Sequence, residues 1–187
     1  MATSVQYEMN GVSLERNSDT GVFTITMARQ ENRFNPELCH ALGQCLTRVE
    51  HASHPKALVI TGQGKFFSNG LDLEWMQTNP EGTPHLISSL VWSVLARILV
   101  LDCRTVAAIN GHAFGAGLFL ALSCDYRIMR TQRGYVNFPE VNLGMRLAKV
   151  SAATANSSKR AGSRWEAFSD HAVENISMET IDLCVLF

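Results

Sequence analysis

The feature that most constrains the fold is a repeated order of short strand, glycine turn and helix. Residues 57–61 and 105–109 are almost entirely apolar and have the length of buried strands. Glycines follow both stretches, at positions 62, 64 and 111, and helical stretches come next. Strands that alternate with helices build a sheet covered by those helices, so the sequence predicts an α/β architecture.

Further predicted elements extend this alternation. Two strands at residues 12–16 and 22–27 flank a turn-rich segment and suggest a hairpin. A helix opens at Pro36, which suits the first helical position, with Asn35 as its N-cap. The other predicted elements are a helical turn at 71–76, a long helix from residue 86, a buried helix at 115–123 and a strand at 126–129.

Composition restricts the class of protein. The 187 residues suffice for one domain with a sizeable core, and their formal net charge of -1 does not suggest nucleic acid or an anionic membrane as partner. Arg97 interrupts the most apolar long stretch, so we expect a core helix there and no membrane span. None of the five cysteines forms a C-x-x-C pair, and His112 has no second ligand at metal spacing. We therefore expect free, mostly buried thiols and no metal site.

Two glycine-rich segments invite nucleotide-binding interpretations, and both fail. A P-loop ending at Lys65 needs glycine at position 59 and serine or threonine at 66, where the chain has Val59 and Phe66. A dinucleotide fingerprint starting at Gly115 needs a small residue at position 120, where Leu120 stands. The glycines must therefore serve another purpose.

Each of these segments, 66–73 and 110–117, leads from a strand through a tight turn into the start of a helix. A helix start presents free backbone N–H groups and the positive end of the helix dipole. Two such starts aimed at one point can stabilise a negative charge that develops on an oxygen atom. From composition alone, ordinary turn chemistry is the preferred interpretation of both segments.

Four motifs in order carry a family resemblance. They are F-F-S-N-G-L-D-L at 66–73, A-A-I-N-G-H-A-F-G-A-G at 107–117, S-C-D-Y-R-I-M-R at 123–130 and F-P-E-V-N-L-G at 138–144. Together, over roughly residues 10–145, they resemble the crotonase (enoyl-CoA hydratase/isomerase) superfamily, and most of all its peroxisomal-type Δ3,Δ2-enoyl-CoA isomerases.

The resemblance implies a spiral of ββα turns in which the backbone N–H groups of Leu71 and Ala116 form an oxyanion hole. It implies an acyl-CoA thioester as the partner and no separate cofactor, because coenzyme A is part of the substrate. The substrate-binding residues that it implies are Ser68, Asn69, Gly70, Leu71, Asp72, Ala116 and Phe119.

The number of carboxylates indicates the reaction. Hydratases of the superfamily use two glutamates to handle water, and the first would fall at position 119, where this chain has Phe119. The second falls at Glu140, which is present. Isomerases of the superfamily work with that single carboxylate as the catalytic base. Outside the motif, an exposed surface carboxylate would be the simpler interpretation of Glu140.

The resemblance ends after residue 145. The sequence therefore predicts a catalytic core at 1–145 and a divergent tail at 146–187, whose composition allows flexibility and whose residues from 166 on have weak helical character. In relatives the corresponding helical region completes the site and builds trimers, so here it is missing or altered and this chain need not trimerise. A non-catalytic, truncated crotonase-like protein that binds acyl-CoA or a full-length partner is the alternative, and thioester hydrolysis is a third possibility.

The resemblance also implies fatty acid β-oxidation in the peroxisome. The N-terminal sequence has no apolar signal core, and the terminal residues 185–187 read V-L-F instead of a peroxisomal Ser-Lys-Leu-type tripeptide. Without such a signal, the cytoplasm is the expected location.

Overall fold

The computed structural model describes residues 3–139 and 165–168, which form a large sheet, a small sheet and covering helices. The first three strands of the large sheet pair antiparallel, and the following strands pair parallel. In spatial order the large sheet contains β1 (Thr3–Met9), β2 (Val12–Asn17), β3 (Val22–Met27), β4 (Ala57–Gly62), β6 (Arg104–Ile109), β8 (Tyr126–Arg130) and β10 (Trp165–Phe168).

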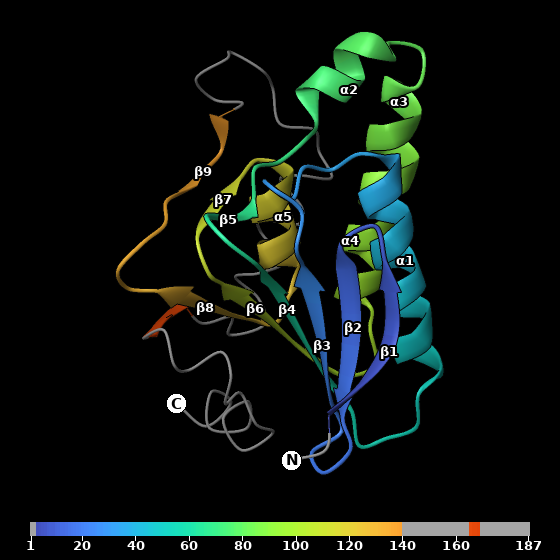
Figure 1. Cartoon of the computed structure of the whole chain (residues 1–187), viewed down its shortest axis with the longest axis vertical. Helices are drawn as coiled ribbons and strands as arrows, with labels where there is room; N and C mark the ends of the chain where they lie inside the picture. Colours follow the sequence, from blue (N-terminus) through green and yellow to red (C-terminus); the bar gives the residue numbers. More distant parts are fainter. Residues whose placement is uncertain (1–2, 140–164, 169–187) are drawn as a thin grey trace.

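The helices pack against the large sheet and against each other. Figure 1 shows the first helix and the fourth side by side along the sheet, with the fifth behind the central strands. The helices are α1 (Pro36–His51), α2 (Leu73–Thr78), α3 (Thr83–His85), the π-helix η1 (Leu86–Val91), α4 (Trp92–Leu99) and α5 (Ala116–Ser123). Side chains from α1, α4, α5 and one face of the sheet form the main buried cluster.

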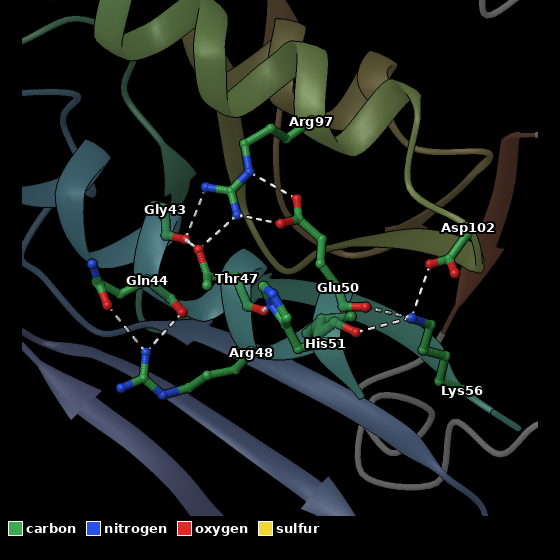
Figure 2. A network of polar contacts seen from close by, with 10 residues as sticks. Gly43, Gln44, Thr47, Arg48, Glu50, His51, Lys56, Arg97 and Asp102 are labelled. Carbon is green, nitrogen blue, oxygen red and sulfur yellow. Dashed lines mark hydrogen bonds and ion pairs between the residues drawn. The ribbon is translucent and has the colours of Figure 1, made fainter. Parts of the chain in front are cut away.

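A polar network joins α1 to α4 at the edge of this cluster (Figure 2). Arg97 of α4 donates through Nε and Nη2 to the two carboxylate oxygens of Glu50, each at 2.8 Å, and through Nη1 to the carbonyl of Gly43 at 2.9 Å. The buried Lys56 ammonium donates to two carbonyls at the end of α1 and pairs with Asp102 at 2.9 Å. These contacts hold α1 and α4 together.

The small sheet stands where the strands of the large sheet end. It contains β5 (Phe66–Ser68), β7 (His112–Phe114) and β9 (Val136–Asn137), all parallel. β4 runs through a turn into β5 and then α2, and β6 runs in the same way into β7 and then α5. This repeated ββα order confirms the predicted α/β, crotonase-like spiral.

The predicted start is right for the first helix and two residues early for the second. The first helix begins at Pro36, and the Asn35 side chain caps it by accepting from the Leu38 N–H at 3.0 Å. The helical turn predicted from residue 71 begins instead at Leu73, because the Asp72 carboxylate takes the cap position and accepts from the Trp75 N–H at 3.1 Å.

Five strands were not predicted: β5, β7 and β9, which form the small sheet, and β1 and β10, which lie at the two edges of the large sheet. β1 lies at the edge of the sheet and is mostly exposed, so it lacks the apolar alternation that signals a strand. The weak helical pattern expected from residue 166 does not hold for β10, which pairs with the open edge of β8. That edge offers unpaired N–H and C=O groups, and aromatic residues such as Trp165 favour strands. The rest of the predicted tail lies outside the described residues.

Candidate active site

Two loops meet at the end of the large sheet, one after β5 and one after β7. A Cβ atom placed on Gly70 would lie 2.9 Å from the Phe114 carbonyl oxygen and 3.5 Å from the Ala116 nitrogen. Gly70 also has a φ of +83°, which disfavours any residue with a side chain. The backbones of the two loops are therefore in direct contact, as the two helix starts of the sequence suggested.

A second close approach locks the first turn of α5 against β5. A Cβ atom on Gly117 would lie 2.6 Å from both Cβ and the carbonyl oxygen of Ser68, and 2.8 Å from its Oγ. A side chain at position 117 would thus collide with backbone that cannot move aside. The small residues of the G-A-G motif are explained by this packing, without any bound nucleotide.

Two backbone N–H groups at this junction have no acceptor among the described residues. The N–H of Phe34 donates to the Gly70 carbonyl at 2.7 Å, and the Phe34 carbonyl accepts from the Asp72 N–H at 2.9 Å. In such a parallel bridge, the N–H of the bridged residue, Leu71, points to the opposite side. Ala116 begins α5, so its N–H has no partner within the helix. Within the described part of the chain, neither N–H donates a hydrogen bond.

Asn32 holds the first loop in this position, and the sequence analysis did not identify it. Its side chain is fully buried and donates to the carbonyls of Phe66 and Phe67, both at 3.1 Å, while it accepts from the Arg29 N–H at 2.9 Å. The Ser68 hydroxyl donates in turn to the Asn32 carbonyl at 2.7 Å. A positive φ of 50° at Asn32 is a conformation that asparagine tolerates better than most residues.

The polar substrate-binding candidates have structural partners of their own. Asn69 donates to the Glu31 carboxylate at 2.7 Å, and this bond, followed by one from Arg33, holds the pKa of the Glu31 carboxyl below its usual range. Asp72 accepts from the Asn35 side chain at 3.2 Å in addition to capping α2. The side chain of Asp72 also lines a polar cavity of about 380 Å³, together with Arg29 and other residues of 29–35.

Phe119 lies one helical turn after Ala116 and contributes an apolar wall. It is 5% exposed, and its ring centroid lies 5.9 Å from that of Trp92 and 4.6 Å from that of Phe138. No carboxylate occupies the position that holds the first glutamate in hydratases. The predicted base, Glu140, lies outside the described residues, and the described chain reaches Pro139 next to it.

The described residues offer neither a metal site nor a membrane helix. Residues 3–139 and 165–168 contain no group of three or more His, Cys, Asp or Glu side chains placed to hold a metal ion. In the same ranges, no helix has both the length and the apolar character needed to cross a bilayer.

Comparisons with known proteins agree with this arrangement. Residues 17–164 match the enoyl-CoA hydratase/isomerase family, a range that runs beyond the end of the four motifs. Among curated proteins, the chain is 39% identical to enoyl-CoA delta isomerase 3 of Arabidopsis thaliana over 137 residues, which cover 71% of this chain and 57% of that protein. It is also 39% identical to the peroxisomal enoyl-CoA delta isomerase 2 of the same plant over 147 residues, or 75% of this chain and 61% of that protein.

Solved structures show the same fold. An enoyl-CoA hydratase/carnithine racemase from Magnetospirillum magneticum superposes with a TM-score of 0.75 at 19% identity, covering 95% of this chain and 74% of its own. An enoyl-CoA hydratase from Bacillus anthracis gives 0.74 at 22% identity, covering 94% and 76%. The chain spans about three fifths of the length of the curated relatives described above. Its sequence and its fold place the chain in the enoyl-CoA hydratase/isomerase family of the crotonase superfamily.

Proposed function

We propose that the chain is an enoyl-CoA isomerase that moves the double bond of a 3-enoyl-CoA to give the 2-trans-enoyl-CoA. The observation that carries this proposal is the apolar wall at Phe119, in the same helix that begins with Ala116. A hydratase needs a second carboxylate there to hold the attacking water, and a buried phenylalanine ring packed between two other aromatic rings leaves no place for one. The site is therefore suited to a reaction that moves a proton and adds no water.

The proposed mechanism uses one base and two backbone donors. Glu140 removes a proton from C2, and the electron pair shifts onto the thioester oxygen. The N–H groups of Leu71 and Ala116 donate to that oxygen while it carries negative charge. Glu140 then returns the proton to C4 as the double bond moves to C2–C3, so atoms and charge balance without a cofactor. Such a positioned base contributes typically ~10²–10⁴-fold to the rate.

The surroundings of the two donors support an acyl-CoA thioester as the ligand. Residues 68–72 would line the thioester end, and the aromatic side chains of Trp92, Phe119 and Phe138 would contact the acyl chain. Arg29 and Arg33 line the same polar cavity as Asp72; they pair with Glu37 and Glu31, and a guanidinium group can also bind phosphate. Because two similar enoyl-CoA delta isomerases of Arabidopsis thaliana, 1 and 2, are named as peroxisomal, we extend the proposal to fatty acid β-oxidation in that compartment.

The test is a direct assay of the purified chain with a 3-enoyl-CoA, followed by the ultraviolet absorbance of the conjugated 2-enoyl thioester. Glu140→Gln keeps the shape of the side chain and removes the base, so turnover should fall by at least ~100-fold. Glu81→Gln, a change at an exposed residue, is the matched control and should leave turnover unchanged. Equal turnover of the Glu140→Gln variant and the unmodified chain would reject the mechanism.

The same assay separates the competing functions. Offered a 2-enoyl-CoA, the chain should form little 3-hydroxyacyl-CoA, and hydration as fast as the double-bond shift would refute the argument from Phe119. Release of free coenzyme A would indicate thioester hydrolysis. Binding of acyl-CoA without any turnover would support a non-catalytic role for this chain.

A further inference from the structure

His112 makes a contact that the proposed reaction does not yet use. It begins β7, the middle strand of the small sheet, and its ring lies among the side chains of Phe66, Phe114 and Tyr135. The ring is nearly parallel to that of Tyr135, with centroids 5.5 Å apart and an interplanar angle of 17°. These neighbours hold the imidazole in one orientation.

The side chain of His112 completes the hydrogen bonding between β7 and β9. The N–H groups of Ala113 and Gly115 donate to the carbonyls of Tyr135 and Asn137, both at 3.0 Å. In a regular parallel ladder, the Tyr135 N–H would donate to the carbonyl of residue 111. It donates instead to Nδ1 of His112 at 3.2 Å. A side chain thus replaces the backbone acceptor at the point where the chain enters β9.

The direction of this bond defines the state of the imidazole. A backbone N–H can only donate, so Nδ1 must present its lone pair and the ring proton must be on Nε2. Asparagine carries an acceptor oxygen at a similar distance from the backbone, whereas phenylalanine carries a ring without an acceptor. Substituting His112 by asparagine or by phenylalanine therefore tests the acceptor and the aromatic ring separately.

The segment anchored in this way leads to the proposed base. From Tyr135 the chain passes through β9 to Phe138, whose ring packs on Phe119, and Glu140 follows two residues later. We propose that His112 is a positioning residue, which fixes β9 through its Nδ1 acceptor and thereby the chain as far as Pro139, next to the proposed base. This inference rests on the proposed isomerase function. It adds to that function a residue that does not touch the reacting atoms.

The experiment compares His112→Asn with His112→Phe. Amide hydrogen exchange at Tyr135 measures the bond itself and needs no catalysis. We expect exchange to speed up about tenfold in His112→Phe, equivalent to about 1.4 kcal/mol, and to remain near the unmodified rate in His112→Asn. Turnover should follow the same order, with kcat about tenfold lower in His112→Phe, KM within about twofold, and kcat largely restored in His112→Asn.

Each outcome decides a separate point. Equal exchange at Tyr135 in all three proteins overturns the inference. A His112→Asn variant whose Tyr135 amide exchanges as fast as in His112→Phe, or whose turnover is as low, also overturns it, because the ring would then matter and the acceptor would not. If His112→Phe fails to fold, His112→Leu, a smaller side chain that also lacks an acceptor, takes its place in the comparison with the same expected results. Absence of turnover in all three proteins, with the expected exchange pattern intact, rejects the proposed reaction while the role of His112 in holding β9 stands.

Discussion

Replacing Gly117 by alanine is the sharpest probe of how the two loops fit together. The added Cβ atom would lie 2.6, 2.6 and 2.8 Å from the Cβ, carbonyl oxygen and Oγ of Ser68, where ordinary contact begins at about 3.4 Å. The hydroxyl can rotate away, but the carbonyl belongs to β5 and can move only if the strand moves. Overpacking of this kind costs typically ~1–3 kcal/mol, so we expect the free energy of unfolding to fall by about that amount.

The same displacement should separate the two backbone donors. Loss of one oxyanion donor reduces kcat by roughly 10²–10³-fold in other enzymes, and we expect Gly117→Ala to lose at least about tenfold in isomerase turnover. Gly43→Ala is the matched control, because its Cβ atom would meet one neighbour, Nη1 of Arg97, at an ordinary 3.5 Å. As a helix-interior position of α1, it should instead gain about 0.5–1 kcal/mol. Urea unfolding of both variants measures the difference, and a Gly117→Ala protein as stable as Gly43→Ala would refute this account of the junction.

Three further predictions concern the frame around the site. Asn32→Ala removes three hydrogen bonds of a buried side chain and should lower the free energy of unfolding by about 2–4 kcal/mol in urea unfolding. The control is Asn10→Ala, which has nearly the same positive φ but is exposed and has no side-chain partner in the described chain; it should cost about 1 kcal/mol. The hydrogen bond from Arg97 lowers the pKa of Glu50, so that pair stabilises the fold above about pH 4.3 and loses its contribution as pH falls further. Glu50→Gln removes the charge and leaves the bonds of Arg97 to Gly43 and Thr47 in place, so its unfolding curve should differ from that of the unmodified chain by under ~1 kcal/mol at pH 7 and converge with it in acid; a constant difference would contradict the pairing. Burial raises the pKa of the Cys103 thiol to about 11 and the pKa values of the more deeply buried Cys39, Cys45 and Cys124 to about 12. Peptide mapping of the folded chain at pH 8 should therefore show slow alkylation, with Cys103 labelled before the other three, and urea should make all four react fast.

Sequence reasoning succeeded where a local signal is strong. Asn35 and Pro36 announce the start of α1 because a cap and a proline act within a few residues of each other. Asn32 gave no comparable signal, since its role depends on carbonyls more than thirty positions away, at Phe66 and Phe67. The start of α2 was placed two residues early, although Asp72 caps it with the same spacing as Asn35 caps α1, because the apolar Leu71 was counted as part of the helix.

The candidate active site also combines features that the sequence could predict with features that it could not. The sequence motifs predicted that the loops at Gly70 and Ala116 would converge, and their backbones are in contact. The assignment of Leu71, Ala116 and Glu140 to catalytic roles stays a prediction until turnover is measured. The aromatic partners of Phe119 could not be predicted, because Trp92 and Phe138 are distant from it in sequence and contact it only in the folded chain.

The parallel crossovers of the large sheet also affect the order of folding. The antiparallel strands β1 to β3 join neighbours in sequence and can pair early, whereas β4 and β6 pair only after a connection of some forty residues has closed. Of the two N–H donors, Leu71 lies within that connection and Ala116 follows β6. A partly folded chain that holds only the N-terminal strands and α1 would thus contain neither half of the oxyanion site, and binding competence should appear late, with the final cooperative step of refolding.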